Sequence, residues 1–239
     1  MEQRGKVIIV TGIIGAGKSS LSRELAQELG GLFLSEPDEK AAATGSNPYL
    51  SDFYADQSRW ALTMQLHLLG IRYRMHQHAQ WHAMSAGEHA VLDSSYWQDT
   101  AYARLQLVNG AMSQREYDTY TALYQAMTAS VLLPNVCIRL KVSPEVAQRR
   151  VVSRMETQTG RTCENVIDLG YLRDLDTEVQ RMVDALQTYG VDVIEVPWDE
   201  DRQTPEAREP IVTALAKAIR QVPENDDGYE LRRLHGRRI

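Results

Sequence analysis

The sequence is poor in the features that mark secreted, membrane-spanning and nucleic-acid-binding proteins. Only two of its 239 residues are cysteine, and Cys137 and Cys163 show neither metal-ligand spacing nor a disulfide framework, which predicts a reducing, cytoplasmic setting. No apolar run approaches the length of about 18 residues that crosses a membrane, and no charged-then-apolar leader precedes the first predicted strand. The net charge of −6 argues against a general nucleic-acid binder, which needs a basic surface.

The length favours one α/β domain over two independent ones. A chain of 239 residues can bury a full core, and no internal repeat or low-complexity linker divides it. We expect one domain over residues 1–220, with a polar flap at about 155–165. Residues 221–239 are charged and lack apolar periodicity, which predicts a loose tail.

The stretch that organises the chain is Gly12-Ile13-Ile14-Gly15-Ala16-Gly17-Lys18-Ser19, which fits the phosphate-loop pattern G-x-x-x-x-G-K-[ST]. A short β-branched run over residues 7–10 precedes it, and apolar residues at helical spacing follow it over residues 21–29, as the motif requires. Backbone N–H groups of such a loop bind phosphate, while Lys18 reaches the β- and γ-phosphates and Ser19 can bind Mg²⁺. The predicted nucleotide-binding residues are Gly12, Gly15, Ala16, Gly17, Lys18, Ser19 and Ser20.

Strands alternate with helices along the rest of the chain. Further strands are predicted at about 32–35, 90–93, 136–142 and 191–196, and helices at about 52–86, 99–108, 113–132, from 144, 172–190 and 205–219. This alternation predicts a parallel sheet covered by helices on both faces. The third strand ends in Asp93, placed to hold Mg²⁺, and the second delivers Glu36 to its carboxyl end, where α/β sheets bind ligands.

Several polar residues suit transfer of phosphate to a small acceptor. Glu36 can accept the proton of a hydroxyl acceptor. Gln65 and Arg72 lie seven residues apart and share one helix face, where they can present donors and acceptors to a nucleobase, and Asp99 can hold Arg72 in a bidentate pair.

Two arginines supply the remaining positive charge. Arg150 and Arg154 are four residues apart and are expected to project toward the flap, where they neutralise charge on the transferred phosphate.

Together these motifs resemble the deoxyribonucleoside kinases, which phosphorylate the 5′-hydroxyl of a deoxynucleoside with ATP. The resemblance covers about residues 7–190. The motifs that carry it are Gly12 to Ser20, Ser35-Glu36-Pro37, Phe53-Tyr54, Arg59-Trp60, Gln65, Arg72, Asp93-Ser94-Ser95, Asp99, and Ser143-Pro144-Glu145 leading to Arg150 and Arg154. It implies a P-loop NTPase fold with a five-stranded sheet in the order 2-3-1-4-5, the cofactors ATP and Mg²⁺, and a homodimer formed by the helices from about Asp52 and Ser113.

The resemblance also implies individual roles. Glu36 becomes the general base for the 5′-hydroxyl, with Lys18, Arg150 and Arg154 around the phosphates, and Asp93 joins Ser19 at the metal. The residues that it assigns to the nucleoside are Tyr54 and Glu164 for the sugar 3′-hydroxyl, and Gln65, Arg72 and Asp99 for the base. The chain departs from the family at Ser94, where an arginine usually helps to hold the base carboxylate and the transferred phosphate.

Two other functions are compatible with the phosphate loop. A nucleoside monophosphate kinase of the thymidylate kinase type shares the sheet and the loop but must clamp an acceptor phosphate with basic groups. A regulatory module that hydrolyses ATP slowly would leave Glu36, Gln65, Arg72 and Asp99 without a task. The carboxylate Glu36 and the uncharged Ser94 favour a neutral hydroxyl acceptor, and the preferred base stays open.

Overall fold

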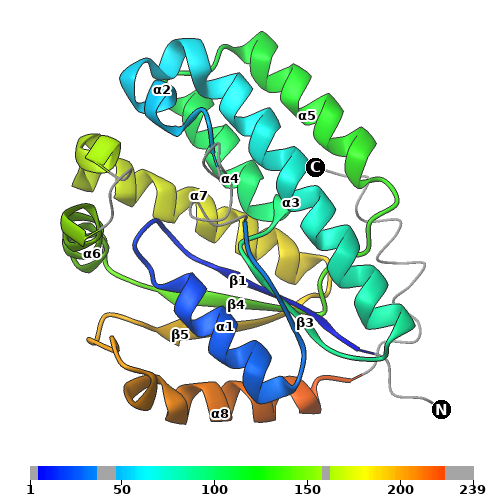
Figure 1. The fold of residues 1–239 in the computed structure, drawn as a ribbon. Coiled ribbons are helices and arrows are strands. Elements are labelled where there is room, and N and C mark those ends of the chain that lie inside the picture. The colour runs from blue at the N-terminus through cyan, green and yellow to red at the C-terminus, as the bar shows by residue number, and fades with distance from the viewer. Residues whose placement is uncertain (1–4, 37–46, 158–161, 224–239) are drawn as a thin grey trace.

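The computed structural model describes residues 5–36, 47–157 and 162–223, and its centre is a parallel sheet (Figure 1). The predicted tail from 224 onward, and Pro37 and Gly160-Arg161, lie outside the described residues. The strands are β1 (Val7–Thr11), β2 (Leu32–Leu34), β3 (Ala90–Asp93), β4 (Val136–Lys141) and β5 (Asp192–Pro197). Their order is β2-β3-β1-β4-β5, all parallel, which confirms the predicted fold class and strand order.

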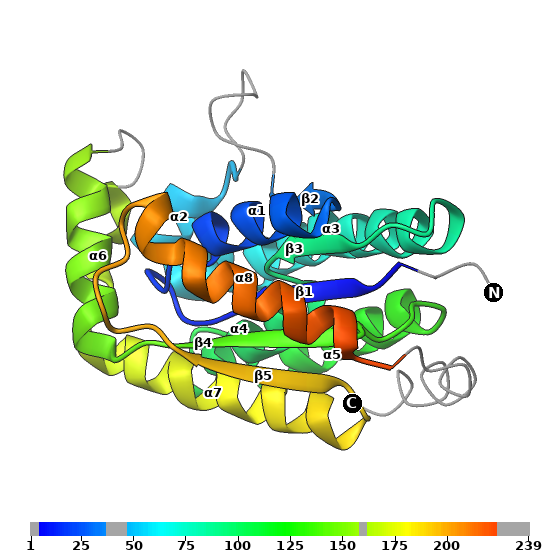
Figure 2. The same ribbon diagram turned by 90° about the horizontal axis from the view of Figure 1, so that it is seen from below.

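Helices cover both faces of the sheet (Figures 1 and 2). One face carries α1 (Lys18–Leu29) and α8 (Pro205–Gln221). The other carries α3 (Gln57–Ser85), α4 (Tyr96–Val108) and α7 (Leu169–Thr188), with α5 (Gln114–Thr128) packed outside α3 and α4. The short α2 (Leu50–Ala55), α6 (Pro144–Thr157) and the 3₁₀ helix η1 (Thr162–Val166) gather at the carboxyl ends of the strands.

The central strand β1 explains why the sequence run at 7–10 is entirely apolar. All five of its residues are buried, because β3 and β4 flank the strand and helices cover both faces. Val10 of β1 pairs with Asp93 of β3, so the phosphate loop after β1 begins beside the acid at the end of β3. The sheet therefore brings the ends of β1, β2 and β3 together at one edge.

The structure corrects the predicted helix at 52–86. Asp56 has φ −147° and ψ 86°, which ends α2, and its side chain accepts a hydrogen bond from the Arg59 backbone N–H to cap α3. Two helices therefore replace one. The predicted start near Asp99 is also late, because Ser95 is the extended N-cap residue of α4 and the helix begins at Tyr96. The capping box of Ser113 and Glu116 at the start of α5 is confirmed.

The ends of two further segments also differ from prediction. Helix α5 ends at Thr128, before the predicted limit near Leu132. The described part of the predicted flap contains the end of α6 and the 3₁₀ helix η1, so it is more regular than its polar sequence indicated. None of the helices in the described ranges is long and apolar enough to span a membrane.

Candidate functional site

The phosphate loop is built around two left-handed glycines. Gly15 has φ 79° and Gly17 has φ 89°, and residues with a Cβ rarely adopt this region of positive φ. A Cβ on Gly15 would lie 2.5 Å from the Ala147 carbonyl oxygen of α6, and one on Gly17 would lie 3.1 Å from Trp198 Nε1. The loop is thus packed between α6 and the segment after β5, and only glycine fits at either position.

Lys18 begins α1 and folds back over the loop. Its Nζ donates hydrogen bonds to the carbonyl oxygens of Gly12 and Ile13, both at 3.0 Å. Desolvation lowers the pKa of Lys18 to about 8, against the attraction of Asp93. A bound phosphate would add negative charge beside the ammonium and favour its charged form. The next two predicted nucleotide ligands, Ser19 and Ser20, are exposed in the first turn of the helix.

The two predicted metal ligands suit Mg²⁺ by their chemistry. Ser19 offers an exposed hydroxyl, and Asp93 offers a partly exposed carboxylate that acts on Lys18. Within the described part of the chain, no group of three or more His, Cys, Asp and Glu residues could hold a metal ion by itself. Mg²⁺ is commonly bound by one or two protein oxygens together with substrate phosphates, and Ser19 and Asp93 offer oxygen ligands of that kind.

Arg72 joins two of the predicted site carboxylates. Its Nε donates to Glu36 Oε1 at 2.7 Å, its Nη2 lies 2.6 Å from the same oxygen, and its Nη1 donates to Asp99 Oδ1. The side chains of Arg72, Glu36 and Asp99 are 9%, 34% and 0% exposed. Burial raises the pKa of Asp99 to about 7, although Arg72 opposes this rise. Glu36, Arg72 and Asp99 therefore form one cluster of two carboxylates around one guanidinium, the acidic triad.

Tyr102 lies beside the triad, and Gln65 shares a helix with its central arginine. Gln65 is buried on α3, the helix of Arg72, and the ring of Tyr102 lies 5.9 Å from the Arg72 guanidinium carbon. Burial raises the pKa of Tyr102 to about 12. Two acceptors, Gln65 Oε1 and Asp99 Oδ2, are buried without a hydrogen-bond partner among the described residues. Buried polar atoms normally have partners, so these two oxygens suit the N–H groups of a ligand.

The predicted sugar residues come from α2 and η1, which pack against each other. Burial raises the pKa of Tyr54 well above its usual value, and Glu164 contributes to this rise. The Glu164 side chain is buried and accepts a hydrogen bond from Arg154 Nη2 at 2.6 Å. Arg154 also acts on the charge of Lys18. The structure therefore brings Tyr54, Glu164, Arg154 and Lys18 into one neighbourhood.

Arg150 contacts a different part of the site. Its Nη2 donates to the carbonyl oxygens of Trp198 at 2.9 Å and Glu200 at 3.0 Å, and its Nη1 donates to the Ala16 carbonyl oxygen at 3.5 Å. Arg150 therefore ties the segment after β5 to the phosphate loop, while Arg154 contacts η1.

Two residues beside the phosphate loop were not predicted from the sequence. Gln98 accepts from Thr11 Oγ1 at 2.8 Å and donates to the Gly12 carbonyl oxygen at 3.1 Å, so it links α4 to the start of the phosphate loop. Its position directly before Asp99 was the available signal. Trp198 follows the fifth strand, where α/β sheets bind ligands, but no motif marked it.

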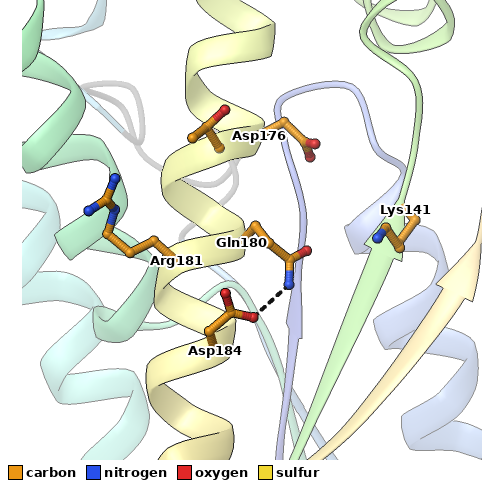
Figure 3. Close-up of a pocket in the computed structure, with 6 residues that line it drawn as sticks. Lys141, Asp176, Gln180, Arg181 and Asp184 are labelled. Carbon is orange, nitrogen blue, oxygen red and sulfur yellow. Dashed lines mark hydrogen bonds between the residues drawn. The ribbon is translucent and has the colours of Figure 1, made fainter.

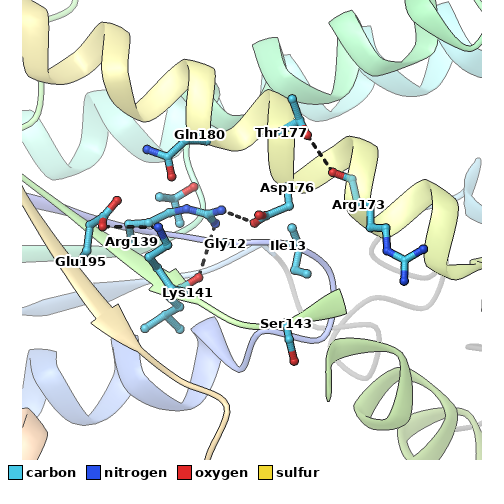
Figure 4. Close-up of polar contacts among 12 residues, drawn as sticks. Gly12, Ile13, Arg139, Lys141, Ser143, Arg173, Asp176, Thr177, Gln180 and Glu195 are labelled. Carbon is cyan, nitrogen blue, oxygen red and sulfur yellow. Dashed lines mark hydrogen bonds and ion pairs between the residues drawn. The ribbon is translucent and has the colours of Figure 1, made fainter. Parts of the chain in front are cut away.

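A groove lies apart from these residues, beside α7 and the end of β4 (Figure 3). It has a volume of about 540 Å³, and its lining residues are Lys141, Asp176, Thr177, Gln180, Arg181 and Asp184. None of the predicted site residues lines it. Two of its charged residues are paired locally: Arg139 donates to Asp176, and Lys141 Nζ lies 3.5 Å from Glu195 (Figure 4). We assign no ligand to it.

Comparison with known proteins identifies one family. A family model described as deoxynucleoside kinase matches residues 8–220. Deoxyguanosine kinase of Dictyostelium discoideum is 32% identical over 194 residues, which are 81% of this chain and 64% of that protein. Deoxyadenosine kinase of the same organism is 30% identical over 196 residues, 82% of this chain and 74% of that protein. The match thus spans a little under two thirds of the first relative.

Solved structures share the fold. A structure of deoxyadenosine kinase from M. mycoides with the products dCMP and a flexible dCDP bound superposes with a TM-score of 0.70 at 25% identity, covering 88% of this chain and 99% of that one. Another structure of that kinase, with bound dCTP, gives a TM-score of 0.69 at 23% identity over 88% of this chain and 99% of that one.

Proposed function

We propose, because this chain belongs to the deoxynucleoside kinase family, that it transfers the γ-phosphoryl group of ATP to the 5′-hydroxyl of a deoxyribonucleoside. The observation that carries the proposal is the Glu36 carboxylate, which lies just after β2 and is bound by Arg72. A neutral hydroxyl needs a proton acceptor, whereas an acceptor phosphate needs a cationic clamp. Relatives named for deoxyguanosine and deoxyadenosine support the same class of acceptor.

In the proposed reaction Glu36 accepts the 5′-hydroxyl proton as the new O–P bond forms, and ADP leaves. Phosphoryl transfer depends mainly on positioning and on neutralising the charge of the phosphate oxygens. Lys18 at the phosphate loop and Arg154 next to it supply positive charge for this task. Arg150 binds three backbone carbonyl groups and supports the loop that holds the nucleotide. Ser19 and Asp93 would hold Mg²⁺, which supplies further charge neutralisation when bound.

The nucleoside is proposed to contact residues of α2, α3, α4 and η1. Gln65, Arg72 and Asp99 bind the base, and Tyr54 and Glu164 bind the sugar 3′-hydroxyl. The buried acceptors Gln65 Oε1 and Asp99 Oδ2 favour a base edge that carries N–H donors. The kinase domain is proposed to span residues 1–220, with the flap at about 155–165.

We also propose that the enzyme is a cytoplasmic homodimer that pairs through α3 and α5. These two helices pack side by side on the outer surface (Figure 1). Three large apolar side chains on them, Trp81, Met84 and Leu123, are exposed. A two-fold axis would cover such side chains in both copies at once. Light scattering that gives a monomer at micromolar concentration would contradict this assembly.

A panel of acceptors tests the reaction. The four deoxynucleosides and their 5′-monophosphates are each offered with ATP and Mg²⁺, and the release of ADP is measured. We expect at least one deoxynucleoside to stimulate release far more than any monophosphate. A monophosphate that is phosphorylated faster than every nucleoside would favour the thymidylate kinase type, and ATP hydrolysis indifferent to all acceptors would favour a regulatory module.

A further inference from the structure

The position after the β3 carboxylate carries no positive charge in this chain. Ser94 is buried, has a positive φ of 72°, and donates its backbone N–H to the Val10 carbonyl oxygen at 3.2 Å. Its hydroxyl is buried and has no partner among the described residues. Ser94 therefore makes no ionic contact with Glu36.

Arg72 of α3 makes that contact. Two nitrogens on one side of its guanidinium, Nε and Nη2, lie 2.7 and 2.6 Å from Glu36 Oε1. Such charge-assisted hydrogen bonds fix the direction of a carboxylate as well as its position. The third nitrogen, Nη1, is held by Asp99. Because the guanidinium is rigid and planar, the orientation of Glu36 depends on the contact with Asp99.

We propose that Arg72 is the positioning residue for the catalytic base, and that it couples recognition of the nucleobase to proton abstraction. This inference rests on the proposed function. A base that binds Asp99 and Arg72 holds the guanidinium in place, and the guanidinium in turn holds the Glu36 carboxylate beside the 5′-hydroxyl. Arg72 thus contributes to the rate of transfer as well as to the affinity for the base.

The charge balance supports this coupling. Two carboxylates, Glu36 and Asp99, share one guanidinium, and the side chains of Arg72 and Asp99 are almost inaccessible to water. A neighbouring cation favours the ionised form of a carboxylate, which is the form that accepts a proton. Lys18 is another cation that acts near Glu36, while Asp99 and the Tyr102 hydroxyl lie near Glu36 and Arg72 from α4.

The two possible roles of Arg72 differ in their kinetics. A residue that only binds the base stabilises the ground state and the transition state equally, so its loss raises KM and leaves kcat unchanged. A residue that positions the catalytic base also lowers kcat when it is removed. The separation of kcat from KM therefore decides between them.

The experiment compares Arg72→Met with Arg74→Met in the 239-residue chain. Arg74 is an exposed arginine two residues further along α3, so it is a matched control. For Arg72→Met we expect kcat at saturating deoxynucleoside to fall by about 10²-fold, the lower end of the contribution of general-base catalysis. The nucleoside KM should rise, and the KM for ATP should be nearly unchanged. The pH at which kcat falls to half on the acidic side should also rise, whereas Arg74→Met should match the wild type.

Two further measurements keep the inference falsifiable. If Arg72→Met fails to fold, Arg72→Lys, which keeps the positive charge but lacks the paired guanidinium nitrogens, should recover part of kcat. Added methylguanidinium should partly restore kcat to Arg72→Ala. A change in nucleoside KM alone, at wild-type kcat, would overturn the positioning role and leave the proposed function intact. A wild-type protein that phosphorylates no deoxynucleoside would overturn both.

Discussion

Two regions of this molecule each contain a buried arginine bound to a carboxylate, and they differ in how the charges are balanced. In the groove region, Arg139 of β4 is 0% exposed and donates to Asp176 of α7, whose side chain is 38% exposed. In the acidic triad, Arg72 serves two carboxylates, and that of Asp99 is 0% exposed. The first is a balanced pair whose carboxylate reaches solvent, whereas the second has one more carboxylate than arginine, and one of its two carboxylates, that of Asp99, is fully buried.

This difference separates a contact that stabilises the fold from one that suits a ligand. Asp176 can complete its hydration from solvent, so the groove pair needs no further partner. Asp99 cannot, because its Oδ2 is buried without a donor among the described residues. Substitutions should therefore affect activity at the triad and the phosphate loop, and stability at the groove.

The largest expected effect is that of Lys18→Ala, which should lower kcat by about 10³-fold or more, because the ammonium neutralises charge in the transition state. Turnover and thermal unfolding are measured together. The matched control is Lys141→Ala in the groove region, which should keep wild-type turnover. Retention of a tenth of the activity in Lys18→Ala would contradict the triphosphate assignment.

The second-largest expected effect is on the free energy of unfolding, and it concerns the pair of Arg139 and Asp176. Asp176→Ala leaves the buried Arg139 without its carboxylate and should cost about 3 kcal/mol of unfolding free energy. Arg139→Met leaves Asp176 able to hydrate and should cost about 1 kcal/mol or less. Urea unfolding of both variants measures the difference. If Arg139→Met proved the more damaging, the groove pair would not be the balanced contact described above.

Glu36→Gln should lower kcat by about 10²-fold with little change in nucleoside KM, since the amide keeps the shape of the side chain and cannot accept the proton. Steady-state kinetics at saturating ATP measure both constants. Full turnover in this variant would mean that the triad takes no part in catalysis and is a contact that stabilises the fold, as the groove pair is.

The smallest expected effect is that of Asp99→Asn, which should weaken deoxynucleoside binding by about tenfold, the range expected when a hydrogen bond to a charged group is lost. Burial raises the pKa of Asp99 to about 7. As the pH falls through this value the carboxyl takes up a proton and loses acceptor capacity, so wild-type affinity should weaken. Calorimetric titrations between pH 6 and pH 8, about one unit on either side of this value, should show this step in the wild type and not in Asp99→Asn. An equal step in both would assign the titration to another group.

The sequence predicted the sheet and the phosphate loop because both depend on local patterns. The apolar run before Gly12 and the motif up to Ser19 specify strand, loop and helix within about 20 residues, and the strand order followed from the family resemblance. The helix break at Asp56 was also readable in principle, because aspartate is a favoured N-cap residue. The long apolar stripe that follows it hid this signal.

The contacts of the site were less predictable. A pair between Arg72 and Asp99 was expected, but the bond from Arg72 to Glu36 joins residues 36 positions apart on different elements, and no spacing rule indicates it. The same holds for Arg150, whose helical spacing predicted a direction toward the flap, while its partners lie after β5. Side-chain direction at these positions is set by tertiary packing, which periodicity does not encode.

The close approach of Trp198 to Gly17 gives the molecule an optical property. The indole is buried, and its nitrogen lies 3.1 Å from the point where a Cβ on Gly17 would stand, so it is next to the backbone of the phosphate loop. Emission from an indole depends on the polarity and charge of its surroundings. The chain has only four tryptophans, and two of the others, Trp60 and Trp81, lie on α3. Trp198 is thus a native fluorophore beside the nucleotide site, and its emission can follow occupancy of the loop without any attached label.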